Sequence, residues 1–256
     1  MNGRSGGPLP RAVVLDTDGV LIDSAPLHAA AWKTAFDACL DEPTTAKGTE
    51  APFDVDTDYR RFVDGRSRYD GAEAFLTARG IHLPPGEPED APGRGTVRAV
   101  AARKEEAFQE ALRAEPVVAF PDAEEALGAL RSLGVPCAAV SASRHARALI
   151  AAAGLDTLLV TVVDGEDAAR LGLPGKPDPA LFLHAAHHLG VPPGETALVE
   201  DALAGVRAGR RGGFGLVVGL DRTPDGHATA ALRSQGADLV TPDLTTLVRG
   251  LWSDRG

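Results

Sequence analysis

Ala12-Val13-Val14-Leu15-Asp16-Thr17-Asp18-Gly19-Val20 is the stretch of sequence that decides the fold. Its apolar run, residues 12–15, predicts a buried strand. Asp16 and Asp18 follow at the end of that strand, just before a glycine turn. Two carboxylates so close together are costly to desolvate unless a cation or a proton lies between them. This placement indicates a magnesium-assisted site for phosphoryl chemistry, with one carboxylate as the nucleophile and the other as the acid/base.

The composition of the chain limits its partners and its location. The formal net charge of the 256 residues is −10, which argues against a nucleic acid or an anionic membrane surface as a partner. Cys39 and Cys137 are the only cysteines and show no CxxC spacing, so we expect two reduced thiols and a cytoplasmic protein. No apolar run has the length of a membrane span, and residues 1–10 lack the apolar region of a secretory signal. We also expect a monomer.

Helices and strands alternate along the second half of the chain. Strands separated by helices predict a parallel sheet that is covered on both faces. The predicted strands are Val135–Val140, Thr157–Val163, Thr196–Val199, Gly215–Gly219 and Ala237–Val240, and the helices between and before them are Asp122–Leu133, Arg144–Ala153, Asp178–Leu189, Leu203–Arg211 and Ala228–Gln235.

The region after the first strand has a different pattern. Helical segments are predicted at residues 26–40, 56–63, 71–78 and 96–113, and strand signals are absent there. The first strand belongs with the later ones. We therefore expect an α/β protein with a Rossmann-like core, residues 1–26 and 114–256, and a helical domain, residues 27–113, inserted after the first strand.

Polar residues follow each of several predicted strands. Ligands of a doubly wound sheet bind at the carboxyl ends of its strands. Besides Asp16 and Asp18, the residues at that edge are Ser141-Ala142-Ser143, Lys176 in Gly175-Lys176-Pro177, and Glu200-Asp201. Mg²⁺ prefers oxygen ligands. We expect Asp16 and Asp201 to bind it directly, Glu200 directly or through water, and Asp18 through its backbone carbonyl.

This set of residues supports transfer through an aspartyl-phosphate. Asp16 would be the nucleophile, with Lys176 and the metal cancelling its repulsion of a phosphate. Asp18 would protonate the leaving oxygen and later deprotonate the incoming hydroxyl. Ser141 could donate to a phosphate oxygen, and Ser143 could do the same or cap the next helix. His28 and Trp32, four residues apart on one helix, suit function and simple packing equally well.

The motifs together resemble those of the haloacid dehalogenase superfamily. All four occur in order: Asp16-Thr-Asp18-Gly-Val-Leu-Ile-Asp-Ser, Ser141, Lys176 in Gly-Lys-Pro-Asp-Pro, and Glu200-Asp201. The resemblance implies a Rossmann-like core, a helical cap between the first two motifs, Mg²⁺, and an aspartyl-phosphate mechanism on a phosphorylated sugar or another small phosphomonoester.

A finer resemblance is to the β-phosphoglucomutase subfamily. It rests on His28 and Trp32, on Arg68, on Lys104 after Arg103, and on the run Ser141-Ala142-Ser143 before Arg144. It implies that Arg68 and Lys104 bind the phosphate that is not transferred or close the cap. It also implies that His28 places Asp18 or reads the sugar, and that residues 141–144 bind substrate.

The acceptor of the phosphoryl group stays open at this point. The subfamily resemblance implies conversion of β-D-glucose 1-phosphate to D-glucose 6-phosphate, whereas Lys176-Pro177-Asp178-Pro179 has a form common among phosphatases of the superfamily. A phospho-receiver domain predicts a much shorter chain without an insertion. A nucleotide-dependent dehydrogenase is disfavoured because no GxGxxG follows the first strand.

Overall fold

The computed structural model describes residues 8–40, 51–114, 117–223 and 225–252. The first seven residues, where a secretory signal was not expected, lie outside this part. The chain divides into two compact units, a core unit of residues 1–22 and 119–256 and a helical unit of residues 23–118. The boundaries drawn from the sequence were 26/27 and 113/114, whereas the structure has its joints at 22/23 and 118/119.

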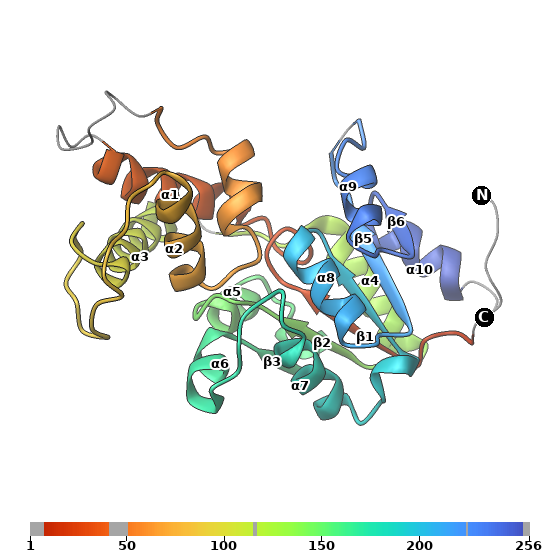
Figure 1. The fold of residues 1–256 in the computed structure, drawn as a ribbon. Helices are drawn as coiled ribbons and strands as arrows, with labels where there is room; N and C mark the ends of the chain where they lie inside the picture. Colours follow the sequence, from red (N-terminus) through yellow and green to blue (C-terminus); the bar gives the residue numbers. More distant parts are fainter. Residues whose placement is uncertain (1–7, 41–50, 115–116, 224, 253–256) are drawn as a thin grey trace. The chain divides into compact units, whose positions relative to one another are not determined.

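The core unit is built on a six-stranded parallel sheet with the order β3-β2-β1-β4-β5-β6 (Figure 1). The strands are β1 (Ala12–Asp16), β2 (Cys137–Val140), β3 (Thr161–Val163), β4 (Thr196–Glu200), β5 (Leu216–Leu220) and β6 (Leu239–Thr241). Every residue of β1 and β4 is buried, as expected for strands that are covered on both faces. The prediction of a Rossmann-like α/β fold is confirmed.

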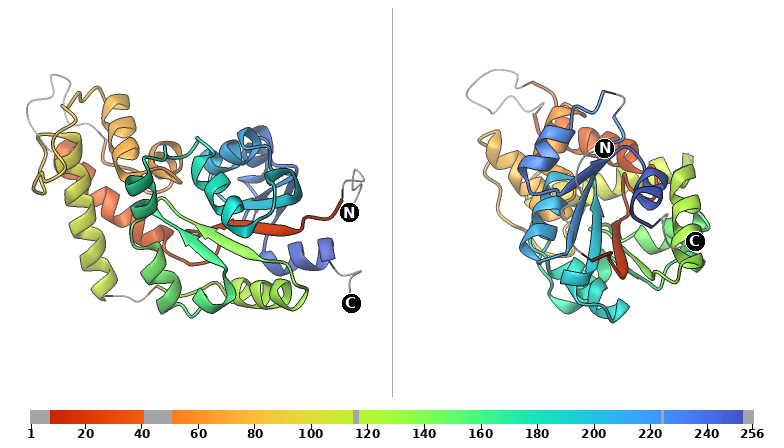
Figure 2. Two further views of the ribbon diagram at one scale, coloured as in Figure 1. Left: turned by 90° about the horizontal axis from the view of Figure 1, so that it is seen from below. Right: turned by 90° about the vertical axis from the view of Figure 1, so that its right-hand side faces the viewer.

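Seven helices of the described core unit flank this sheet (Figure 2). One face packs against α7 (Ala180–Leu189), α8 (Leu203–Arg211) and α9 (Thr229–Ser234) through a cluster that includes Val14 and Leu198. On the other side, α4 (Pro121–Ser132) and α10 (Leu244–Trp252) contact each other and the sheet. The remaining two are α5 (Ala146–Ala152) and α6 (Gly165–Leu171).

The sheet order creates a switch point between β1 and β4. The chain adds β2 and β3 on one side of β1 and then returns to add β4, β5 and β6 on the other. Val14 pairs with Leu198 and Leu15 with Val199, so Asp16 and Glu200 end their strands at the same level. The crevice at such a switch point is the usual ligand site of an open α/β sheet.

The helical unit contains α1 (Ala25–Leu40), a short π-helix η1 (Tyr59–Val63), α2 (Arg68–Ala78) and α3 (Val97–Ala114). Its core is aromatic: the Phe36 ring lies 4.7 Å from Trp32, 5.1 Å from Phe53 and 4.1 Å from Phe75, measured between centroids. No strand occurs among the described residues of this unit, in agreement with the prediction.

One predicted strand needs correction, and two helices were missed. The strand predicted at Thr157–Val163 begins only at Thr161, because residues Asp156–Leu158 form a 3₁₀ turn, η2. Helices α6 and α10 were not predicted.

Among the described residues, no helix has both the length and the apolar content that a membrane crossing requires.

Candidate active site

Asp16 and Lys176 form the centre of the predicted site. Asp16 is the last residue of β1, and Lys176 lies in the loop before α7; both side chains are buried. The Lys176 ammonium donates to Asp16 Oδ1 and, at 2.5 Å, to Glu200 Oε1. Burial alone would lower the pKa of Lys176, but the charges of Asp16 and Glu200 outweigh it and raise that pKa above its ordinary value. Lys176 is therefore a fixed cation.

Three carboxylates lie around this one ammonium. Oxygen atoms of Asp16, Glu200 and Asp201 are within 4.8 Å of one another. Burial raises the pKa of Asp16 well above its usual range. The charge of Lys176 lowers this pKa, whereas the charges of Glu200 and Asp18 raise it further. Three ionised carboxylates would carry more negative charge than the one ammonium can balance, and repulsion from Glu200 contributes to the raised pKa of Asp16.

The donor set suits a hard divalent cation. All ligand atoms are carboxylate oxygens, which Mg²⁺ prefers, and the surplus negative charge is what a bound cation would neutralise. Asp16, Glu200 and Asp201 are therefore the residues that could hold Mg²⁺. The Asp18 side chain is not part of this cluster, and the contribution of its backbone carbonyl stays a prediction.

Two glycines give the carboxylates their space. Gly19 has a φ of 80°, and a Cβ there would lie 1.9 Å from Asp201 Oδ2. A Cβ at Gly205, in the first turn of α8, would lie 1.7 Å from Glu200 Oε1. Any side chain at either position would displace a candidate ligand. Gly205 was missed from the sequence, since a glycine inside a helix shows no signal of what it faces.

Asp18 has a different partner from Asp16. Ser141 Oγ donates to Asp18 Oδ2 at 2.7 Å and accepts from the backbone N–H of Ser143 at 3.0 Å. The hydroxyl predicted to donate to a phosphate therefore donates to the acid/base candidate in this structure. Thr17, between the two aspartates, is fully buried and donates to the Val140 carbonyl at 3.0 Å, which joins the ends of β1 and β2.

The loop of residues 141–144 is supported from behind. Ser143 Oγ accepts from the His145 N–H at 3.2 Å. Helix α5 begins at Ala146 with His145 at its N-cap position and has no side-chain cap, so Ser143 closes the turn before the helix and the predicted cap is wrong. Gly165, at the start of α6, donates its N–H to the Ser143 carbonyl at 3.1 Å. A Cβ at Gly165 would lie 2.6 Å from the Ala142 carbonyl oxygen and 3.1 Å from Arg144 N. Gly165 was missed because α6 itself was not predicted.

Three of the predicted residues of the helical unit lie together. Lys104 is buried, and its Nζ is 2.9 Å from His28 Nδ1. The His28 ring stacks on Phe108 at 4.1 Å, and Lys104 Nζ lies 4.3 Å from the Phe108 centroid and 5.7 Å from that of Trp32. An ammonium can only donate, so His28 Nδ1 accepts and its proton sits on Nε2. With Lys104 protonated, His28 Nε2 is thus a buried N–H donor.

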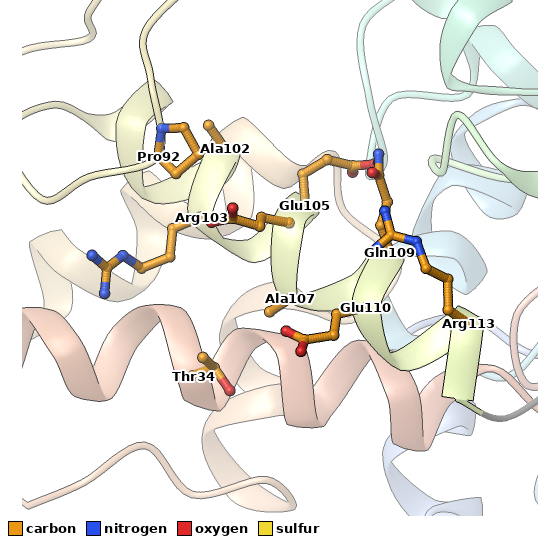
Figure 3. Close-up of a pocket in the computed structure, with 10 residues that line it drawn as sticks. Thr34, Pro92, Ala102, Arg103, Glu105, Ala107, Gln109, Glu110 and Arg113 are labelled. Atoms are coloured by element: carbon orange, nitrogen blue, oxygen red, sulfur yellow. The ribbon is translucent and has the colours of Figure 1, made fainter.

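Arg68 is held by a different contact. It begins α2 after the N-cap Ser67, and its Nη1 donates to Glu105 Oε2 at 2.5 Å. A cavity of about 660 Å³ (Figure 3) is lined mainly by residues of α3: Glu105, which is the partner of Arg68, and Arg103, Glu106, Glu110 and Arg113. His28, Trp32, Arg68 and Lys104 do not line it.

Comparison with known proteins agrees with these motifs. Residues 10–213 match the family model of haloacid dehalogenase-like hydrolases. The chain is 42% identical over 239 residues to a β-phosphoglucomutase of Mycobacterium bovis, covering 93% of this chain and 91% of that protein. It is 35% identical over 123 residues to a trehalose-phosphate phosphatase of Mycobacterium leprae, covering 46% of this chain and 26% of that one.

A solved structure supports the fold. The β-phosphoglucomutase of Clostridium difficile superimposes with a TM-score of 0.72 at 21% identity, covering 96% of this chain and 97% of that chain. At this identity the likeness concerns the fold alone.

Proposed function

The chain belongs to the haloacid dehalogenase-like hydrolase family and is an enzyme that transfers or hydrolyses phosphoryl groups, and from this premise we propose that it is a Mg²⁺-dependent β-phosphoglucomutase. In this proposal it converts β-D-glucose 1-phosphate to D-glucose 6-phosphate through the 1,6-bisphosphate. Its 42% identity over most of the chain to a β-phosphoglucomutase supports the choice of substrate.

Asp16 is the proposed nucleophile. Its carboxylate oxygen attacks the phosphorus of the bisphosphate, the bond from phosphorus to the sugar oxygen breaks, and that oxygen takes a proton from Asp18. In the return step Asp18 removes the proton from the hydroxyl of the next sugar phosphate, which attacks the aspartyl-phosphate and frees Asp16. Lys176 balances charge on the transferring group throughout.

Asp18 suits the acid/base role because its surroundings differ from those of Asp16. Asp16 is paired with a fixed ammonium, whereas Asp18 accepts a hydroxyl hydrogen bond from Ser141. Two carboxylates in different environments can hold different protonation states at one pH. Bound at Asp16, Glu200 and Asp201, Mg²⁺ would supply Lewis-acid stabilisation of phosphate charge.

The observation that carries the mutase over a phosphatase is the buried Lys104–His28 pair. A mutase must hold a second, non-reacting phosphate, while a phosphatase need only admit water. Lys104 is a cation immobilised against the rings of Phe108 and Trp32, and His28 offers a donor at Nε2. We assign both side chains to the non-transferred phosphate or the sugar, together with Arg68. Trp32 and residues 141–144 complete the proposed substrate-binding set.

The test supplies β-glucose 1-phosphate, Mg²⁺ and a trace of the 1,6-bisphosphate and measures glucose 6-phosphate and inorganic phosphate in the same samples. We expect glucose 6-phosphate with little free phosphate.

Lys104→Met should raise the KM for the sugar phosphate about 10- to 100-fold, the worth of a charge-assisted hydrogen bond. Lys33→Met, which removes a half-buried lysine paired with Asp37, is the control and should leave KM unchanged.

The second candidate is a sugar-phosphate phosphatase that uses the same Asp16 and releases the phosphoryl group to water. The match to a trehalose-phosphate phosphatase over 123 residues favours keeping it. Release of phosphate without glucose 6-phosphate would assign this activity and reject the mutase. The expected monomer and cytoplasmic location stay predictions.

A further inference from the structure

We infer that Arg222, which lies two residues beyond β5, is a positioning residue for Asp18. Its guanidinium holds the turn that follows Asp18 and so fixes where the carboxylate stands. The inference rests on the proposed acid/base role of Asp18, which the mutase and the phosphatase share.

The turn after Asp18 offers two carbonyls to Arg222. The Thr17 carbonyl accepts from the N–H groups of Leu21 and Ile22, and the Ile22 carbonyl accepts from that of Gly19. The carbonyls of Gly19 and Val20 accept from Arg222 instead, Gly19 from Nε at 3.0 Å and Val20 from Nη2 at 2.8 Å. Since Val20 is fully buried, its carbonyl depends on a protein donor.

Arg222 is itself held on its other side. Asp122, in the first turn of α4, accepts from Nη1 at 2.9 Å and from Nη2 at 3.1 Å, and the guanidinium carbon lies 3.9 Å from the Phe120 ring centroid. Asp122 Oδ2 also accepts from the Leu244 N–H of α10 at 2.8 Å. We call Arg222, Asp122 and Phe120 the Arg222 clamp. A planar fork bound on both edges is pre-organised in a way that a lysine cannot reproduce.

The clamp acts where a small shift matters. Gly19 directly follows Asp18, and Arg222 Nε holds the Gly19 carbonyl, so loss of this hydrogen bond lets the backbone that carries the Asp18 carboxylate shift. Ser141 is a side-chain partner of Asp18 but does not hold its backbone. Displacement of a catalytic group by about 1 Å can lower a rate about 100-fold.

The chain contains a matched arginine away from this site. Arg210 donates from Nε at 3.1 Å and from Nη2 at 2.8 Å to the Gly236 carbonyl and pairs with Asp238. Arg210 therefore binds a backbone carbonyl and a carboxylate near β6, as Arg222 does near Asp18. If Arg222 were only a structural staple, loss of either arginine would have similar effects on activity.

The kinetic test uses two leaving groups. A sugar alkoxide needs a proton from Asp18 as it leaves, whereas p-nitrophenolate leaves without one. We expect Arg222→Ala to slow Asp16 phosphorylation by the sugar bisphosphate about 10- to 100-fold. Phosphorylation of Asp16 by p-nitrophenyl phosphate, measured as the burst of p-nitrophenolate, should stay close to the wild-type rate. Arg222→Lys should fall between, and Arg210→Ala should match wild type on both substrates. Equal losses on both substrates, or the same loss in Arg210→Ala, would overturn the inference.

A second measurement needs no substrate. Amide hydrogen exchange over residues 18–22 should become faster in Arg222→Ala and in Asp122→Asn, while exchange in β4 stays as in the wild type and Arg210→Ala leaves residues 18–22 unchanged. Unchanged exchange in Arg222→Ala rejects the clamp. A wild-type protein that transfers no phosphoryl group defeats the proposed function, and the exchange result still decides whether Arg222 holds the turn.

Discussion

Asp16 and Asp18 are separated by one residue, yet the protein gives them different surroundings. Asp16 ends a strand and points its carboxylate at Lys176, among other acids. Asp18 stands past the strand and accepts from Ser141. At the scale of the residue, the division of labour between nucleophile and acid/base follows from these two sets of partners.

Exchange of either carboxylate for an amide should separate their roles. Asp16→Asn should abolish turnover and aspartyl-phosphate formation, because the amide is a poor nucleophile. Asp18→Asn should keep Mg²⁺ binding and lower turnover about 10²- to 10⁴-fold, the range of general acid–base catalysis. Steady-state kinetics, mass spectrometry of the phosphorylated protein and calorimetric Mg²⁺ titration measure the three quantities. Asp156→Asn, at an exposed turn, is the control, and near-normal turnover in either site variant would contradict its assigned role.

Cys137 gives a prediction about pH. Burial raises the pKa of its thiol to about 12, from a reference value of 9.0. In the unfolded chain the thiol ionises near that reference value, so the folded state binds an extra proton between the two values and stability falls as pH rises through this window. At pH 9 we expect iodoacetamide to modify Cys137 quickly only after denaturation. Stoichiometric labelling of Cys137 in the native protein would contradict its buried, neutral state.

At the scale of the element, helix α8 shows how a helix positions a ligand. Its predicted bounds, Leu203–Arg211, are those observed. What the pattern could not show is that Gly205 faces Glu200, whose Oε2 also accepts from the Ala202 N–H at 2.6 Å. The helix therefore carries a glycine where a larger residue would push a carboxylate out of the cluster.

Gly205→Ala should weaken Mg²⁺ binding about 10- to 100-fold, the effect seen when the support of a metal ligand is lost. Its Cβ would lie 1.7 Å from Glu200 Oε1, so that carboxylate must move. Gly209→Ala, one turn later, is the matched control: its Cβ would meet Leu198 Cδ2 at 2.2 Å and should lower the free energy of unfolding by about 1–3 kcal/mol without changing Mg²⁺ affinity. Equal Mg²⁺ affinities in the two variants would contradict this role of Gly205.

Helices α6 and α10 were missed in the sequence for different reasons. Helix α6 has seven residues and none is buried, so apolar periodicity is absent; only the capping box of Asp164 and Asp167 marks its start. Helix α10 does carry a periodic apolar face, with Leu244, Leu247, Val248 and Trp252 buried. Its pattern was available in the sequence, whereas that of α6 was not.

At the scale of the whole molecule, the Mg²⁺ site predicts a change in stability. Binding to the folded chain alone stabilises it by RT ln(1 + [Mg²⁺]/Kd), about 2.7 kcal/mol at one hundred times Kd. We expect Mg²⁺ to raise Tm relative to EDTA at equal ionic strength, and Asp201→Asn to reduce the shift. Identical Tm values in Mg²⁺ and EDTA would contradict a metal site at this cluster.

Local pattern carried much of this protein's organisation. We could predict the strand β1, the alternation of later strands and helices, and the helical insertion. Apolar residues recur at a different spacing in strands than in helices, so the sequence distinguishes the two. The carboxyl-end rule then selected Asp16, Asp18, Ser141, Lys176 and Glu200-Asp201 by position alone. Five of these make direct hydrogen bonds in the core, in two groups: Lys176 donates to Asp16 and Glu200, and Ser141 donates to Asp18.

Only the tertiary structure decided which groups share a partner. The neighbouring position of β1 and β4 brings Asp16 and Glu200 to one lysine, and strand order depends on packing between segments far apart in the chain. The same holds for Lys104 against His28, Gly205 against Glu200, and Arg222 on the carbonyls of Gly19 and Val20. These contacts join residues with no regular spacing between them, so no periodicity in the sequence records them. The motif of residues 12–20 therefore indicates the type of chemistry, while folding brings the other residues of the site next to the two aspartates.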